Sequence, residues 1–283
     1  QGMVLNEIFF RKPESGRISY FNPADVDWKT DDKGNRIGAV LRADGQPVES
    51  GGIGTMSKSK NNGVDPQALI EDYGADIARF YMMFTAPPEQ TLEWSDASVE
   101  GASRFLRRLW TLGYEIHQRD ITAAAGSALP AARREIHAVL KQANYDLGRH
   151  QFNTVASATM KMLNALEGVL KSGADSAAGS VLREGLSIML RVLSPIAPHI
   201  AHQLWLDLGY GEDILAAPWP EPDAAALVEN EIELVVQVNG KKRGDVRVPR
   251  DAAKPSIEAA VLAHAEVHKF IAGQPVKKII IVP

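Results

Sequence analysis

The sequence has no cysteine, which excludes disulfide bridges and cysteine-ligated zinc sites and is typical of a protein of the cytosol. It also lacks any uninterrupted apolar run approaching the ~20 residues that a membrane span needs. The first residues, 1–5, contain neither a basic segment nor a signal cleavage site, so no secretory signal is expected there. These absences favour a cytoplasmic protein that does not bind a membrane.

A large excess of one charge is also missing, because the net charge is only −4 over 283 residues. The charge is unevenly distributed, however. Residues 1–100 and 151–230 carry net charges of −6 and −5, whereas residues 101–150 and 231–283 carry +4 and +3. A protein that binds a polyanion needs basic faces rather than an overall positive charge. The two basic segments are therefore the candidates for polyanion binding.

Residues 51–66 show no apolar period of either kind and predict a loop that feeds a helix. Asn61-Asn62-Gly63 is typical of a turn, and Asp65-Pro66 is typical of an N-cap and a first helical position. Lys58 and Lys60 offer ammonium donors, which suits a polyphosphate whose charge moves during a reaction. Because Asp65 is expected to cap the helix, the lysines would provide most of the positive charge. The alternative is a solvated linker.

Apolar residues at helical spacing predict a helix over 67–86 that is broken near Gly74, followed by a bundle of longer helices. The bundle helices are expected over 95–118, from Pro130 onwards, and over 152–170, 176–193 and 198–208, with a loop over 121–130. Five arginines lie off the apolar stripes of the first two bundle helices, namely Arg104, Arg107, Arg108, Arg133 and Arg134. They could line a nucleic-acid backbone, or they could be solvated surface.

Shorter alternating segments at both ends of the chain predict strands. Residues 37–41 are expected to form a strand in a small meander. Near the other end, strands over 232–238 and 242–248 flank Asn239-Gly240, a strong hairpin signal, and precede a helix over 257–271 and a strand over 276–282. This order predicts a small α+β (ββαβ) domain, with Lys241, Lys242 and Arg243 near the hairpin tip.

The segment Met56-Ser57-Lys58-Ser59 resembles the KMSKS signature of class I aminoacyl-tRNA synthetases, with Thr55 in the place of the first lysine. Further segments resemble bacterial leucyl-tRNA synthetases in order and spacing. They are Tyr73-Gly-Ala-Asp-Ile-Ala-Arg79, Met82-Met-Phe84, Leu92-Glu-Trp94, Val99-Glu-Gly-Ala-Ser-Arg-Phe-Leu106 and Gln237-Val-Asn-Gly-Lys-Lys-Arg-Gly244. The resemblance covers nearly the whole chain but only about the last third of the full synthetase.

The resemblance implies a mainly α fold in three parts. Residues 1–97 would be the end of a class I catalytic domain, with a leucine-specific-type insertion at about 17–50 and the signature loop over 54–63. Residues 98–222 would be a helical anticodon-binding domain, and residues 230–283 an α+β tRNA-binding domain. The segment His199-Ile-Ala-His202 superficially resembles HIGH, the other class I signature. It has alanine in place of glycine and follows the lysine loop, so no nucleotide contact is expected there.

For function, the resemblance implies a monomeric enzyme that uses ATP and Mg²⁺ to activate leucine and passes it to tRNA(Leu). Lys58 would stabilise the departing pyrophosphate, while Thr55, Met56, Ser57 and Ser59 would shape the ATP-binding loop. No metal site is expected in this chain, and the chain alone is predicted not to catalyse. The alternatives are a fragment of an isoleucyl or valyl synthetase, or a non-catalytic tRNA-binding module.

Overall fold

The computed structural model describes residues 2–118, 129–172, 176–228, 231–250, 252–271, 276 and 278–281. The chain divides into two compact units, Gln1–Ala226 (unit 1) and Leu227–Pro283 (unit 2). Each unit has its own apolar core and is described separately.

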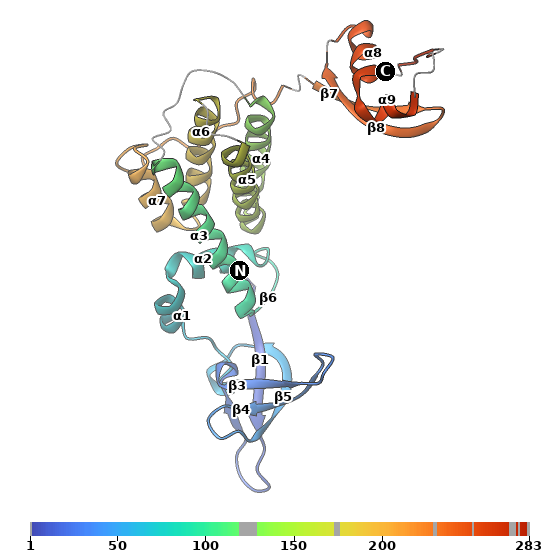
Figure 1. The fold of residues 1–283 in the computed structure, drawn as a ribbon. Coiled ribbons are helices and arrows are strands. Elements are labelled where there is room, and N and C mark those ends of the chain that lie inside the picture. The colour runs from blue at the N-terminus through green and yellow to red at the C-terminus, as the bar shows by residue number, and fades with distance from the viewer. Residues whose placement is uncertain are drawn as a thin grey trace. The chain divides into compact units, whose positions relative to one another are not determined.

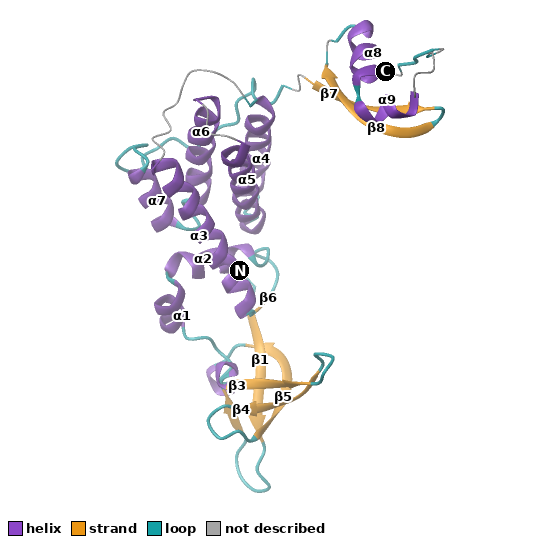
Figure 2. Ribbon diagram, viewed as in Figure 1, coloured by secondary structure: helices purple, strands orange, loops and turns teal. Residues whose placement is uncertain are grey.

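Unit 1 begins with a small sheet that is mostly antiparallel (Figure 2). The strands lie in the order β2-β1-β5-β4-β3, and β6 pairs in parallel with β1. Their bounds are β1 (Val4–Arg11), β2 (Ser19–Phe21), β3 (Val26–Thr30), β4 (Arg36–Leu41), β5 (Pro47–Thr55) and β6 (Leu92–Glu93). A short 3-10 turn, η1 (Pro23–Asp25), connects β2 and β3. The consecutive antiparallel pairing of β3, β4 and β5 confirms the predicted meander.

The glycine-rich residues before the signature lysine belong to β5, so the prediction of a loop is wrong for residues 51–55. Thr55, Gly54 and Ile53 pair with Leu5, Asn6 and Glu7 of β1. Main-chain pairing of this kind does not depend on an apolar side-chain period, which is why the sequence pattern did not reveal it. Gly54 also suits the packing, because a Cβ there would lie only 2.7 Å from Cδ1 of Ile8.

Helices form the rest of unit 1, as Figure 1 shows. Their bounds are η2 (Lys58–Lys60, a 3-10 turn), α1 (Pro66–Tyr73), α2 (Ala75–Phe84), α3 (Asp96–Gln118), α4 (Pro130–Gly148), α5 (Phe152–Ser172), α6 (Ser176–Leu193) and α7 (Pro198–Asp207). The predicted helices and the break at Gly74 are confirmed. The loop predicted over 121–130 lies, up to residue 128, outside the described residues.

A single apolar core joins the bundle helices to the segment before them. The predicted stripe residues Val99, Leu106 and Leu109 of α3 are buried, and so are Phe80 of α2 and Leu92 of β6, which belong to the same core. Burying large apolar side chains in one contiguous core is the main source of stability in a folded domain. The helix that follows the signature loop and the bundle therefore form one packed body within unit 1.

Unit 2 contains the hairpin of β7 (Glu231–Val238) and β8 (Lys241–Pro249), packed against α8 (Lys254–Ala263) and α9 (Ala265–Ile271). Asn239 and Gly240 have φ of 53° and 78°, as a two-residue hairpin turn of the primed type requires, so the predicted hairpin is confirmed.

Two details of unit 2 differ from the prediction. The helix expected over 257–271 is two helices that meet at His264. The strand expected over 276–282 is not formed by the described residues of that range, which have no regular structure. Apolar, β-branched residues favour a strand, but a strand also needs a neighbouring strand to pair with. The described sheet of unit 2 contains only β7 and β8, which pair with each other.

Candidate functional site

The signature loop starts where β5 ends beside β1. The amide of Met56 donates to the carbonyl of Val4 at 3.0 Å, which continues the strand pairing by one residue. Ser57 then caps the 3-10 turn η2, with its side chain accepting from the amide of Lys60 at 3.3 Å. Asn61 ends the turn in the left-handed conformation, with φ of 49°. The loop is therefore a defined turn with both ends fixed.

Asn62 is the main anchor of this loop, and its side chain is fully buried. Its Oδ1 accepts from the amide of Ser57 at 2.8 Å, and its Nδ2 lies 3.3 Å from the carbonyl oxygens of Gly54 and Asn6. Sequence reasoning assigned Asn62 only to a turn. Since its partners are distant in sequence, no spacing signal could have identified this role.

Several polar side chains of the loop are exposed. Lys58, Ser59 and Thr55 are exposed, and Met56 and Ser57 are partly buried. No hydrogen-bond or ion-pair partner of the Lys58 ammonium lies among the described residues, whereas Ser57 and Ser59 have their Oγ atoms 3.3 Å apart. An unpaired ammonium beside two hydroxyls on a fixed turn can bind a phosphate oxygen.

The helix after the loop is capped as predicted. Oδ1 of Asp65 accepts from the amide of Gln67 at 3.0 Å, and Pro66 occupies the first helical position. This carboxylate takes the place an anion would occupy at the start of α1. The positive charge that the loop offers to an anion therefore comes from its lysines.

α2 holds the connection between α6 and α7. Nε and Nη2 of Arg79 donate to the carbonyls of Ile196 and Pro195 at 3.0 and 2.9 Å. Asp76 accepts from the amide of Ile200 at 2.7 Å and from Nδ1 of His199 at 2.8 Å. His199, part of the HIGH-like segment, therefore lies at the start of α7 in a structural cap.

The predicted tRNA-binding arginines of the bundle fall into two groups. Nε and Nη2 of Arg108 donate to the two carboxylate oxygens of Glu167 at 3.0 and 2.8 Å, and this bidentate contact raises the pKa of Arg108. Arg133 is held in a larger network. Arg134 is likewise engaged. Arg104 makes only a long contact of 3.7 Å with Glu100 on an exposed face, and Arg107 lies in an open groove.

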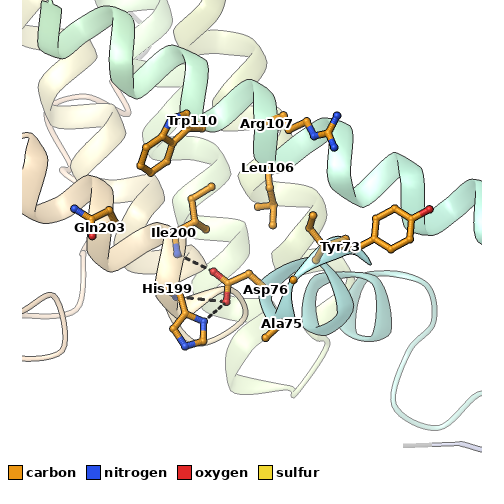
Figure 3. A pocket seen from close by; sticks show the side chains of 11 residues that line it. Tyr73, Ala75, Asp76, Leu106, Arg107, Trp110, His199, Ile200 and Gln203 are labelled. Carbon is orange, nitrogen blue, oxygen red and sulfur yellow. Dashed lines mark hydrogen bonds and ion pairs between the residues drawn. The ribbon is translucent and has the colours of Figure 1, made fainter. Parts of the chain in front are cut away.

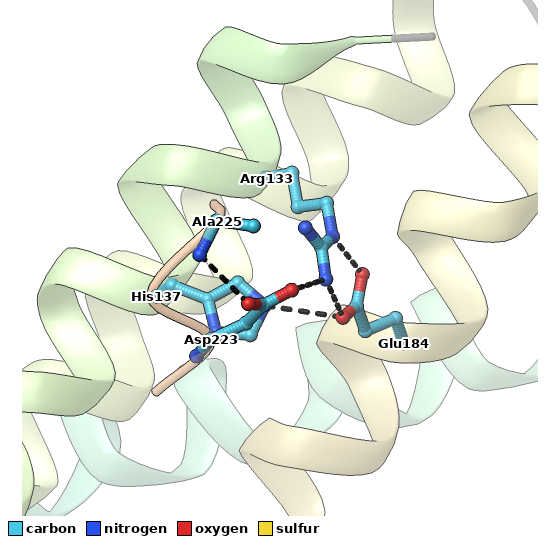
Figure 4. Close-up of polar contacts among 5 residues, drawn as sticks. All are labelled: Arg133, His137, Glu184, Asp223 and Ala225. Atoms are coloured by element: carbon cyan, nitrogen blue, oxygen red, sulfur yellow. Dashed lines mark hydrogen bonds and ion pairs between the residues drawn. The ribbon is translucent and has the colours of Figure 1, made fainter. Parts of the chain in front are cut away.

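The Arg133 network fastens residues 223–225 to α4 and α6 (Figure 4). Arg133 donates to Glu184 at 2.6 and 2.7 Å and to Asp223 at 2.7 Å. The amide of Asp223 donates to Nδ1 of buried His137 at 3.0 Å, so Nε2 of the neutral ring carries the proton and faces Glu184 at 3.1 Å. Hydrogen bonding by His137 and Arg133 lowers the pKa of Glu184 from 4.5 to about 2.

In unit 2, the predicted basic residues do lie at the hairpin tip. Lys241 and Lys242 are exposed, and Nζ of Lys242 lies 2.9 Å from Oδ1 of Asp245. The guanidinium of Arg243 stacks over the ring of Phe270, with 3.7 Å between Cζ and the ring centroid. Lys241 therefore presents its charge directly, whereas Arg243 is partly used within the unit.

Neither a metal-binding cluster nor a membrane-spanning helix is found in the part of the chain that the structure describes. No group of histidine and acidic side chains there is arranged to hold a metal ion. None of the helices there combines the length and apolarity needed to cross a bilayer.

Two family models match the chain. A model described as "Anticodon-binding domain of tRNA ligase" matches residues 131–259, and one described as "tRNA synthetases class I (I, L, M and V)" matches residues 48–95. The second match contains the whole signature loop together with α1 and α2. The class I resemblance of this loop is therefore supported by its surroundings as well as by its own residues.

Curated relatives match over the full length of the chain. It is 58% identical to a leucine--tRNA ligase of Ralstonia pickettii and 60% identical to one of Cupriavidus metallidurans, covering 33% and 32% of those proteins. The chain thus spans about a third of the length of these relatives.

A solved structure described as a ternary complex of Agrobacterium radiobacter K84 agnB2 LeuRS with tRNA and LeuAMS is also similar. It matches with a TM-score of 0.59 and 26% identity, covering 81% of this chain and 30% of that one. The relatives named here are leucine enzymes, which favours the leucine assignment over the isoleucine and valine alternatives. Over its whole length the chain is similar to the C-terminal third of leucine--tRNA ligases.

Proposed function

We propose that this chain supplies the signature loop and the tRNA-binding elements of a leucine--tRNA ligase. The whole enzyme activates leucine with ATP to leucyl-adenylate and then transfers leucine to tRNA(Leu). The observation that carries the proposal is the exposed Lys58 ammonium, which has no described partner and sits on a turn anchored by Ser57 and buried Asn62.

The proposed chemistry is electrostatic. When the leucine carboxylate attacks the α-phosphate of ATP, negative charge gathers on the departing pyrophosphate. A cation that is already positioned lowers the free energy of that transition state, because little reorganisation is needed during the reaction. Lys58 provides the charge, and the side chains of Ser59 and Thr55 are exposed in the same segment. Thr55 offers no charge where the family signature has its first lysine.

Mg²⁺ enters this proposal only with the nucleotide. The described residues offer no cluster of ligands for it. When bound, Mg²⁺ neutralises phosphate charge, and Lys58 adds a protein cation to the same phosphates.

For tRNA, the proposal rests on the anticodon-binding family model and on the relative solved with tRNA. Of the predicted tRNA-binding residues, Arg104, Arg107 and Lys241 keep their charges available, the first two in unit 1 and the third in unit 2. Contacts of Arg108, Arg133 and Arg134 with tRNA stay a prediction, since Arg108 and Arg133 are paired within unit 1 and Arg134 is also engaged. A monomeric state and a cytoplasmic location are part of the proposal, as the family resemblance implies.

The test exchanges the matching third of the Ralstonia pickettii enzyme for this chain and measures leucine-dependent exchange of pyrophosphate into ATP. We expect the chimera to be active and Lys58→Gln to lower its exchange rate by about 100-fold, the loss typical for removing one positioned transition-state donor. Lys33→Gln removes the same charge from an exposed turn of the sheet and serves as the matched control.

Equal rates for the Lys58→Gln and Lys33→Gln chimeras would refute the role of Lys58 and favour a module that only binds tRNA. The isolated chain should show no leucine-dependent exchange, because a loop that stabilises the leaving group does not by itself bind and activate leucine.

A further inference from the structure

An open groove lies in unit 1 where the joint between α1 and α2 meets α3 and α7 (Figure 3). Its volume is about 560 Å³, enough for a single nucleotide rather than a long ligand. The lining comes from four helices and is listed here: Tyr73, Gly74, Ala75, Asp76, Ile77, Leu106, Arg107, Trp110, His199, Ile200 and Gln203.

The groove has an apolar floor and an aromatic wall. Leu106 is buried, and Ile77 and Ile200 are partly buried beside it. The indole of Trp110 is 43% exposed and lies at one side of this floor (Figure 3). An exposed indole beside apolar side chains offers a flat surface on which an aromatic ring can stack.

Within the part of the chain that the structure describes, the groove contains one carboxylate, which is engaged within it, and one guanidinium, which is not. The carboxylate of Asp76 is satisfied by the amide of Ile200 and by the ring of His199. Arg107 is exposed, and no hydrogen-bond or ion-pair partner of its guanidinium lies among the described residues. Among the described lining residues, the groove thus presents one unpaired guanidinium, which matches the single charge of a phosphodiester.

The same face of α3 continues beyond the groove. Tyr114 is 58% exposed and lies one turn after Trp110, and Arg104 lies one turn before the groove. Cationic side chains followed by exposed aromatic ones along one helix face can bind the phosphate and the base of an unstacked nucleotide. Free ATP is a poorer match, because its triphosphate would need more positive charge than Arg107 supplies.

We propose that this groove binds an unpaired nucleotide of an RNA, with the base stacked on Trp110 and its phosphate paired with Arg107. The Oε1 atom of Gln203 is left to accept from the base edge, since its Nε2 donates to Asp207 at 2.7 Å. The identification of that RNA as tRNA(Leu) rests on the proposed function, whereas the chemistry of the groove does not.

The experiment titrates the 283-residue chain with a tRNA(Leu) transcript and follows tryptophan fluorescence and affinity at fixed salt. Stacking of a base on Trp110 should quench part of the emission, and Trp110→Phe should abolish that part while keeping affinity within about threefold. Trp110→Ala should weaken binding about tenfold, as removal of one base–aromatic stack does. Arg107→Gln should weaken binding and reduce its salt dependence.

Matched controls are Tyr145→Ala, which removes an exposed aromatic ring from α4, and Lys161→Gln, which removes an exposed charge from α5. Neither should change affinity by more than about twofold, and circular dichroism should show all variants folded. A blunt RNA duplex, which has no unpaired nucleotide, should not quench Trp110.

Any one of four outcomes would overturn the proposal. Two concern the variants: folded Trp110→Ala binds with parental affinity, or Tyr145→Ala loses as much affinity as Trp110→Ala. The other two are equal quenching by ATP or by the duplex, and no RNA binding by the chain. Lys58→Gln should bind RNA as the parent does. A failure of the catalytic proposal is thereby separated from a failure of this one.

Discussion

The side-chain amides of Asn6 and Asn62 each donate a hydrogen bond to the main-chain carbonyl of the other residue. Nδ2 of Asn6 donates to the carbonyl of Asn62 at 3.2 Å, and Nδ2 of Asn62 donates to the carbonyl of Asn6 at 3.3 Å. Both side chains are buried, with 8% and 0% exposed. These two hydrogen bonds connect the signature loop to β1, so the position of Lys58 depends on two buried side-chain amides.

Asn62→Ala should therefore destabilise unit 1 and loosen the loop. The substitution leaves the amide of Ser57 and the carbonyl of Gly54 without their described side-chain partner. We expect a loss of about 3 kcal/mol in unfolding free energy by urea denaturation, because buried main-chain groups would be left unpaired. Hydrogen exchange at the Ser57 amide should become faster.

Asn62→Asp is the informative companion, since it keeps the acceptor for Ser57 but loses both donors and buries a charge. It should be at least as destabilising as Asn62→Ala at neutral pH. If Ser57 exchanges at the parental rate in both variants, Asn62 is not the anchor.

Substitution by alanine should change stability in opposite directions at Gly74 and at Gly168. Gly74 has φ of 91° at the joint between α1 and α2, where a Cβ is strained, so Gly74→Ala should cost about 1 kcal/mol. Gly168 lies exposed inside α5 with open space around its Cα, so Gly168→Ala should stabilise by about 1 kcal/mol. Thermal melts of the two variants compare them directly, and a shift of the same sign in both would contradict this account.

Stability should fall in acid partly through Glu184. Its pKa is lowered from 4.5 to about 2 in the folded chain, so it contributes stability that is present above its unfolded pKa and is lost as pH falls towards 2. Glu184→Gln cannot titrate. The melting temperature of the parent should therefore drop more steeply between about pH 5 and pH 2 than that of the variant. Parallel pH profiles would show that the network around Arg133 does not depend on this carboxylate.

Asp76→Ala should destabilise the start of α7, because Asp76 accepts from the amide of Ile200 at 2.7 Å. Asp76 caps α7 from α2 in place of an N-cap side chain; the loss of such a capping hydrogen bond costs about 1 kcal/mol, and Asp76→Asn should keep most of the stability, since asparagine can also accept from the amide. Urea midpoints give the measurement. An Asp76→Asn variant as unstable as Asp76→Ala would indicate that the charge, rather than the cap, is what α7 requires.

The local features of the fold could be predicted, because they depend on residues that are close together in the sequence. The stripe of Val99, Leu106 and Leu109 predicted α3, and Asn239-Gly240 predicted the hairpin turn. The pairing of Gly54 with Asn6 could not be predicted, because a main-chain contact between distant strands leaves no periodic trace.

The arginines show the same limit at the candidate site. The basic character of residues 101–150 indicated polyanion binding, yet Arg108 and Arg133 contact Glu167 and Glu184 in the acidic segment that follows. Part of the charge alternation along the chain thus reflects ion pairs between bundle helices. Sequence reasoning did not single out Trp110, although its position off the apolar stripe of α3 and one turn after Arg107 is a signal for an exposed indole.

The short helix α1 follows its N-cap Asp65, just after the signature loop, and ends at Tyr73, which lines the groove together with Gly74. Its eight residues make a rod of about 12 Å. This helix therefore connects the groove to the turn that carries Lys58, so a substitution that displaces α1 should affect both.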